Sequence, residues 1–386
     1  MSGKVYVPIP PRPAGYFQTN PRADLTEDER SMYEEVLAHF TKDSYVLPNE
    51  EKGELTEKEK FWLSRECLLR YLRASKWKVA TAIQRLESTL KWRREFGIYD
   101  LTAEYVEPEA VTGKEIIFGY DVKGRPAFYM IPSRQNTDGV ERQNQFAVWM
   151  LERGIDCMPP GVETLDLLIN FAQRAKHPNF SQARTILSII QDHYPERLGM
   201  ALLLNMPFLV TAFLKLIFPF VDPVTREKVK LNPSPIEDGL FEQDMIMSEY
   251  WGGSQDFEYV HEKYWPEFVK TSTENAARWT AKWKELGGKI GISEWDYKGG
   301  PSSEKEEVDG AVSTSVAVET GEKDEQKPST EPAQKDSKKD EEQAPPQATP
   351  AAGGAVTTAG GGAIAAGAVA GSGGDASAAG GDAGGE

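Results

Sequence analysis

Apolar residues in the first third of the chain repeat with the period of a helix. Four of them recur at i, i+4, i+7 and i+11 and so share one helical face: Val79, Ile83, Leu86 and Leu90. Residues 27–40 and 56–96 are therefore predicted to be helical. Ser75 is expected to break or cap the second of these stretches.

A hairpin is predicted next, in the segment EIIFGYDVKGRPAFYMI (residues 115–131). Its two apolar runs are separated by Lys123 and Gly124, a typical turn pair between strands. A helix over about 138–158 follows and is expected to end before two prolines and a glycine.

Two further apolar runs, TLDLLINF (164–171) and ALLLNM (201–206), are short and continuous. A predicted helix at about 181–194 separates them. Continuous apolar strands alternating with helices are typical of a sheet that is buried on both faces. The pattern indicates a βαβ arrangement, hence an α/β fold with a largely parallel sheet.

The most apolar helix is predicted at 208–218, where only Thr211 and Lys215 are strongly polar. Such a helix is normally buried in a core. Alternatively, it covers an internal cavity on one side and meets a bilayer on the other. The longer stretch 200–221 is not predicted to span a membrane, because polar residues and prolines interrupt it: Asn205, Pro207, Lys215 and Pro219.

Residues 301–386 contain no aromatic residue and are rich in Gly, Ala, Ser, Pro, Glu and Lys, which predicts disorder. They hold sixteen acidic and six basic residues, and so ten of the sixteen net negative charges of the chain. The remainder is mildly acidic and has no basic cluster typical of a nucleic-acid surface. The proline-rich first residues predict an extended arm without the apolar core of a signal peptide.

The common catalytic and cofactor motifs are missing from the sequence. It has no glycine-rich phosphate loop, no GxSxG nucleophile elbow, no HExxH and no Cys/His cluster. Cys67 and Cys157 are expected to be reduced cytosolic thiols. We therefore predict a protein that is not an enzyme and uses no metal or cofactor.

Five segments occur in the order LLRYLRASKWKV, GKEIIFGYDVKGRPAFYM, HYPERLG, FPFVDPVTREK and EYWGG. Together they resemble the CRAL-TRIO lipid-transfer family, and more narrowly the fungal phosphatidylinositol transfer proteins of the subgroup associated with pleiotropic drug resistance. The resemblance extends from about Leu55 to about Leu286.

The resemblance implies a division of the chain. An extended arm (1–26) precedes a small all-helical lobe (27–100) and a lipid-binding lobe (101–298), and a disordered tail (299–386) follows. In the lipid-binding lobe the sheet is expected to floor an apolar cavity that a gate helix (207–218) closes.

The resemblance also implies a headgroup site. Glu196, Thr225 and Lys228 correspond to the family's phosphatidylinositol contacts, and Asp222, Glu227 and Lys76 are expected beside them. A carboxylate can accept from inositol hydroxyls, whereas a phosphodiester needs a cation and a hydroxyl donor. In the empty site Glu196 and Lys228 could neutralise each other.

The remaining predicted site residues are apolar. Six are expected on the gate, in contact with membrane: Phe208, Leu209, Phe213, Leu214, Ile217 and Phe218. Three are expected to line the cavity: Leu165, Leu167 and Ile169.

Two departures from the family pattern affect the expected ligands. Ser75 stands where other members have an arginine, so one phosphate contact is lost or supplied by Arg73. Leu165 and Leu167 stand where members that bind phosphatidylcholine carry hydroxyl groups. Phosphatidylcholine exchange is therefore not expected. An apolar second ligand, such as a sterol, is expected instead.

The function implied is transfer of phosphatidylinositol between membranes by a monomer. The alternative is a lipid-dependent sensor or scaffold that regulates phosphoinositide or sterol metabolism through protein partners; a globular protein without ligand is a third possibility. The implied location is cytoplasmic and peripheral to membranes, at the endoplasmic reticulum, lipid droplets or the cell periphery.

Overall fold

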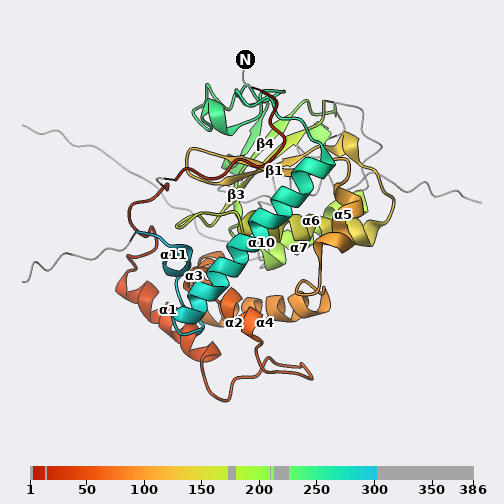
Figure 1. The fold of residues 1–386 in the computed structure, drawn as a ribbon. Coiled ribbons are helices and arrows are strands. Elements are labelled where there is room, and N and C mark those ends of the chain that lie inside the picture. The colour runs from red at the N-terminus through yellow and green to blue at the C-terminus, as the bar shows by residue number, and fades with distance from the viewer. Residues whose placement is uncertain (1–2, 14, 173–179, 209, 213–225, 302–386) are drawn as a thin grey trace, which may run out of the picture. The chain divides into compact units, whose positions relative to one another are not determined.

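The computed structural model describes residues 3–13, 15–172, 180–208, 210–212 and 226–301, all within one unit of the fold. Residues 302–386 of the predicted tail therefore lie outside the described residues. Figure 1 shows the helices of the N-terminal part beside a sheet that carries further helices.

Four helices form the N-terminal part: α1 (Glu27–Phe40), α2 (Glu57–Trp62), α3 (Arg65–Ala74) and α4 (Val79–Glu95). A hydroxyl side chain caps the start of each of the first three, and two of these caps are capping boxes with a glutamate three residues later. Their core is aliphatic and includes Val36, Leu63, Leu68, Leu72, Leu86 and Leu90, all fully buried.

The predicted helix 27–40 is confirmed, and the stretch 56–96 is divided more often than expected. Besides the break at Ser75, which is the C-cap of α3, a second break at Ser64 separates α2 from α3. Lys76 and Trp77 then adopt left-handed backbone conformations, with φ of 53° and 57°. These two residues turn the chain back so that α4 packs against α3.

The second part contains a five-stranded sheet. Its strands are β1 (Glu115–Tyr120), β2 (Pro126–Met130), β3 (Leu165–Asn170), β4 (Leu198–Leu204) and β5 (Val229–Leu231), adjacent in that order. The remaining elements are α5 (Ala103–Ala110), η1 (Pro132–Arg134), α6 (Val140–Ile155), α7 (Phe180–His193), η3 (Gln243–Met245), α10 (His261–Glu285) and α11 (Glu294–Lys298).

The sheet topology agrees with the sequence prediction. β1 and β2 form the antiparallel hairpin, and all later neighbours are parallel. In the register, Phe128 of β2 lies opposite Leu167 of β3, which lies opposite Ala201 of β4. Because crossovers between parallel strands are right-handed, α6 and α7 cover the same face of the sheet.

Several elements differ from the sequence prediction. β4 begins at Leu198, three residues earlier than expected, and so includes Gly199 and Met200. The short strand β5 and the helices α5, α10 and α11 were not predicted. Tyr264 of α10 closes the sheet edge, because its hydroxyl donates to the carbonyl of Ile117 and accepts from the amide of Ile117, each at 2.8 Å.

No helix within the described ranges is both long enough and apolar enough to cross a bilayer. Of the predicted gate helix, residues 208 and 210–212 are helical. Pro207 precedes this helix, and residues 209 and 213–218 of the predicted gate lie outside the described residues.

His193 at the end of α7 joins the two parts of the fold. Its ring stacks on Trp92 of α4, with 4.1 Å between centroids and 5° between planes, and Nδ1 lies 3.1 Å from Oγ1 of Thr89. Burial lowers the pKa of His193 to about 4.

We expect His193 to make the junction sensitive to acid. Its pKa is lower in the folded than in the unfolded state, so the neutral ring contributes stability above about pH 6.5 that is lost as the pH falls towards 4. Over this interval the free energy of unfolding should fall by about 2 kcal/mol more in the wild type than in His193→Phe, after allowance for partial exposure. Urea unfolding at a series of pH values measures this, and parallel pH profiles would contradict it.

Candidate functional site

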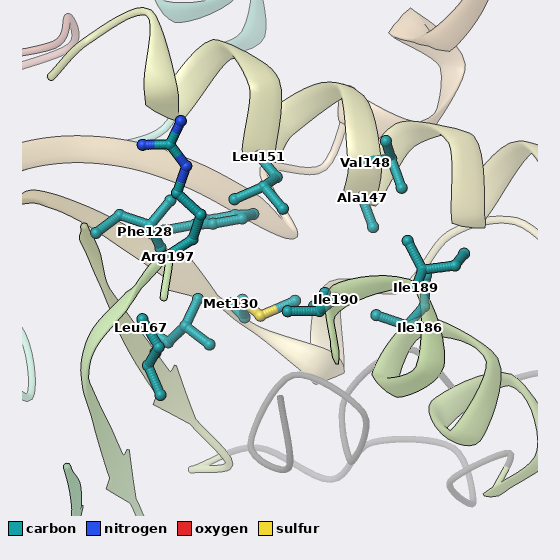
Figure 2. Close-up of a pocket in the computed structure, with 12 residues that line it drawn as sticks. Phe128, Met130, Ala147, Val148, Leu151, Leu167, Ile186, Ile189, Ile190 and Arg197 are labelled. Atoms are coloured by element: carbon teal, nitrogen blue, oxygen red, sulfur yellow. The ribbon is translucent and has the colours of Figure 1, made fainter. Parts of the chain in front are cut away.

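An apolar pocket lies between the sheet and the helices α6 and α7 (Figure 2). It surrounds about 570 Å³ of space not filled by atoms, part of which is open to solvent. Its lining residues come from β2, β3, β4, α6 and α7, and Arg197 is the one charged residue among them. The pocket is therefore suited to hydrocarbon.

Two of the three cavity residues predicted from the sequence lie at this pocket. Leu165 and Leu167 line the pocket, because alternate residues of β3 face α6 and α7. Ile169 is fully buried but does not line this pocket.

The sequence analysis missed the α7 wall of the pocket, which is formed by Ile186, Ile189 and Ile190. Ile189 and Ile190 lie three and four residues after Ile186 within a predicted helix, and this spacing indicates one apolar helical face.

Arg197 does not place its charge in the pocket. Figure 2 shows its guanidinium directed away from the apolar side chains. Nη1 donates to the carbonyl of Glu163 at 2.8 Å, and burial lowers the pKa of Arg197. The arginine therefore contributes its aliphatic stem to the pocket wall.

Glu196 and Lys228 lie at one end of the sheet. Each residue shortly precedes a strand, Glu196 before β4 and Lys228 before β5, and these strands are parallel neighbours. Nζ of Lys228 donates to the carbonyl of Leu198 at 2.9 Å. Leu198 also lines the pocket, so this end of the sheet is next to the apolar space.

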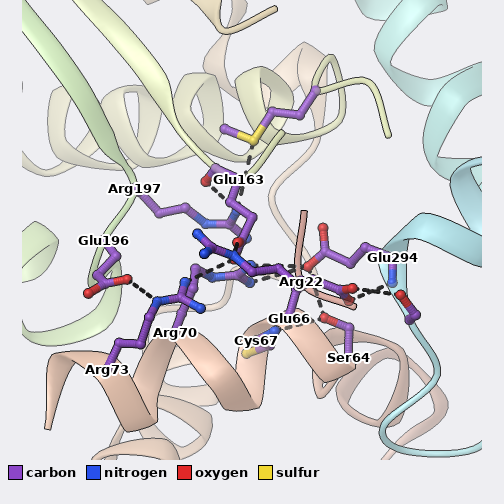
Figure 3. Close-up of polar contacts among 12 residues, drawn as sticks. Arg22, Ser64, Glu66, Cys67, Arg70, Arg73, Glu163, Glu196, Arg197 and Glu294 are labelled. Carbon is purple, nitrogen blue, oxygen red and sulfur yellow. Dashed lines mark hydrogen bonds and ion pairs between the residues drawn. The ribbon is translucent and has the colours of Figure 1, made fainter. Parts of the chain in front are cut away.

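The carboxylate of Glu196 pairs with Arg73, not with Lys228 as expected. Arg73 Nε lies 2.6 Å from Glu196 Oε2, and the side chain of Glu196 is 37% exposed (Figure 3). Arg73 was expected at the phosphate, and its pair with Glu196 was not predicted from the sequence. Arg73 belongs to α3, in the N-terminal part of the fold.

Arg73 also contacts a buried carboxylate, that of Glu163. Glu163 is 7% exposed and lies 2.5 Å from Arg22, 3.0 Å from Arg70 and 3.2 Å from Arg73 (Figure 3). Burial alone would raise the pKa of Glu163, but Arg70, Arg73 and Arg22 lower it to about 2. The carboxylate is therefore charged at neutral pH.

The other predicted headgroup residues are only partly described. Lys76 is exposed on the turn after α3, and Glu227 is exposed beside Lys228. Asp222 and Thr225 lie outside the described residues. The hydroxyl of Ser75 is buried without a hydrogen-bond partner in the described part of the chain.

Of the predicted gate residues, Phe208 is 82% exposed. The remaining five fall on residues or side chains that the structure does not describe: Leu209, Phe213, Leu214, Ile217 and Phe218. Val210, by contrast, is buried against the core, so the helix begins with one apolar side chain inside and one outside.

Among the described residues, no group of three or more His, Cys, Asp or Glu side chains could hold a metal ion. Cys67 and Cys157 are buried free thiols, and burial raises their pKa to about 11 and about 12. Such thiols are protonated and unreactive at neutral pH.

Comparison with known proteins gives two matches to family profiles. The CRAL/TRIO domain matches residues 110–253, and the CRAL/TRIO N-terminal domain matches residues 32–88.

Three relatives show the range of similarity. A CRAL-TRIO domain-containing protein of Schizosaccharomyces pombe is 46% identical over 298 residues, which cover 76% of this chain but only 29% of that protein. The phosphatidylinositol transfer protein PDR17 of Saccharomyces cerevisiae is 39% identical over 321 residues, 77% of this chain and 91% of that protein. The SEC14 cytosolic factor of Candida glabrata is 28% identical over 225 residues, 50% of this chain and 72% of that protein.

We expect Glu163→Gln to lower the free energy of unfolding by about 3–5 kcal/mol, because it removes the buried anion that Arg70 and Arg73 share and leaves them only Glu294 and Glu196. The matched control is Glu285→Gln, which removes an exposed ion pair with Lys282 and should cost less than about 1 kcal/mol. Urea unfolding compares the two variants. Equal small losses would show that the Glu163 cluster does not stabilise the fold.

Proposed function

Because the chain belongs to the CRAL-TRIO family, we propose that it extracts phosphatidylinositol from one membrane, shields its acyl chains and delivers it to another, without catalysis. The observation that carries the proposal is the apolar pocket that ends beside Glu196 and Lys228. The similarity to a phosphatidylinositol transfer protein over 91% of that protein's length supports the same ligand.

The pocket accounts for the transport step. Each CH₂ group withdrawn from a bilayer into water costs about 0.8 kcal/mol, so a lipid with two chains leaves a membrane very slowly unaided. Contact with the leucine and isoleucine side chains of β3 and α7 replaces contact with the bilayer. This substitution removes most of the barrier, since hydrocarbon never meets water.

The polar end of the sheet suits an inositol phosphate. Glu196 is partly exposed and can accept hydrogen bonds from inositol hydroxyls. Lys228 supplies a cation for the phosphodiester, and Arg73 supplies a second one in place of the arginine that Ser75 replaces. Asp222, Thr225, Glu227 and Lys76 complete the proposed site.

Leu165 and Leu167 favour an apolar second ligand such as a sterol. Both line the pocket and neither can hydrogen-bond a phosphocholine group. A sterol would need only apolar contact at this position.

Residues 207–218 form the gate in this proposal, and its movement limits exchange. Opening of a lid takes microseconds to milliseconds or longer. The exposed ring of Phe208 would enter the bilayer while the gate is open, so the protein would visit membranes transiently from the cytoplasm.

The headgroup assignment predicts that Lys228→Ala abolishes phosphatidylinositol transfer between liposomes, because the phosphodiester loses its cation. The melting temperature should change by only a few degrees. Lys60→Ala, which removes an exposed lysine of α2, is the matched control and should transfer at the wild-type rate.

Transfer by Lys228→Ala at the wild-type rate would refute the headgroup role. A wild-type protein that binds labelled phosphatidylinositol but moves none between liposomes would instead identify a lipid sensor.

The gate predicts that Phe208→Asp weakens association with liposomes at least ten-fold. A buried aromatic side chain contributes about 1.5–3 kcal/mol, and a carboxylate in its place opposes insertion. Val46→Asp changes another exposed apolar residue, in the N-terminal part, and should have no effect. Co-sedimentation with vesicles measures both, and equal binding by Phe208→Asp and wild type would exclude this contact.

A further inference from the structure

A second pocket lies on the opposite face of the sheet. It surrounds about 1200 Å³ of space not filled by atoms. Tyr129 and Leu168 line it from the sheet, whereas their neighbours Phe128 and Leu167 line the first pocket. Successive strand residues face opposite sides, so the sheet separates the two spaces.

Arg134 of η1 lines this second pocket with most of its donors unused. Nη1 donates to the carbonyl of Gly113 at 3.3 Å, and no carboxylate of the described residues lies within ion-pair distance. Burial lowers the pKa of Arg134, while Glu249 acts at longer range to raise it. The guanidinium remains charged and lacks a close anion.

Two buried side chains add further unused donors. Tyr129, 1% exposed, accepts from the amide of Met247 at 3.5 Å, and its hydroxyl proton has no acceptor among the described residues. Asn170, 7% exposed, accepts through Oδ1 from Ala172 and Asn205 at 3.0 and 2.8 Å. Its Nδ2 is thereby fixed as a donor, again without an acceptor in the described part of the chain.

Apolar and aromatic side chains form one part of the inner wall. Ile116 and Leu168 form the floor, and Trp251 packs edge-on against Tyr129, with ring centroids 5.7 Å apart. Phe257 closes one side. Donors beside an apolar wall suit a ligand that has acceptor oxygens on a hydrocarbon body.

The rim limits the charge of such a ligand. It carries three carboxylates, Glu249, Asp256 and Glu258, of which the last two lie 3.0 and 3.7 Å from Nζ of Lys4. A polyanion such as an inositol polyphosphate would be repelled by this rim. A ligand whose single negative charge lies at Arg134 would not be repelled in this way.

We propose that this second pocket binds a monocarboxylate with an apolar body, its carboxylate accepting from Arg134, Tyr129 and Asn170. A guanidinium donates to both oxygens of a carboxylate in one plane, which favours this group over an uncharged one. The site is separate from the proposed phosphatidylinositol pocket and does not depend on it.

Calorimetric titration of the full chain with decanoate, below its micelle concentration, tests the site. The wild type should bind one equivalent, and decanol, which has the same chain without charge, should bind at least ten-fold more weakly. Arg134→Met should weaken decanoate binding at least ten-fold, and Tyr129→Phe several-fold. Arg30→Met removes an exposed arginine of α1 and should bind as the wild type does.

A further variant distinguishes the two pockets. Leu167→Trp fills the first pocket and should leave decanoate binding intact. The proposal fails if Leu167→Trp abolishes binding while Arg134→Met does not, if decanol binds as well as decanoate, or if the wild type binds neither. Phosphatidylinositol transfer and melting of Arg134→Met should match the wild type, which shows that its fold is intact.

Discussion

Three arginines from separate parts of the chain converge on the buried carboxylate of Glu163. Arg22 belongs to the N-terminal arm, and Arg70 and Arg73 to α3, whereas Glu163 lies two residues before β3. A lone buried carboxylate would cost several kcal/mol, and so would the buried guanidinium of Arg70. The charges are therefore tolerable only together, which fixes the arm, the helical part and the sheet in one arrangement.

The same cluster positions the polar end of the apolar pocket. Arg73 reaches Glu163 with one guanidinium nitrogen and Glu196 with another. The adjacent Arg197 is held by the carbonyl of Glu163. Since Glu196 and Arg197 directly precede β4, the anchored arginines determine where that strand starts and which side chains face solvent there.

Local patterns predicted most of the fold but not its long-range ion pairs. The hairpin, the βαβ units and helix 27–40 followed from periodicity and turn residues, because neighbouring residues determine them. Helix α10 was missed although Tyr264, Phe268 and Ser272 repeat at helical spacing, since Pro266 within it indicates a break. The Glu196–Arg73 pair joins residues 123 apart in the chain, and nothing in the spacing of either motif indicates it.

Arg73 gives the proposed headgroup site a way to bind and release an anion at low cost. In the empty site its charge is shared by Glu163, which is buried, and by Glu196, which is 37% exposed. Ion pairs of exposed groups are weak, so a phosphodiester could replace Glu196 at Arg73 while Glu163 keeps its contact. Glu196 would then be released towards the inositol hydroxyls. The number of paired charges stays constant in this exchange, and a lipid held in this way can also leave.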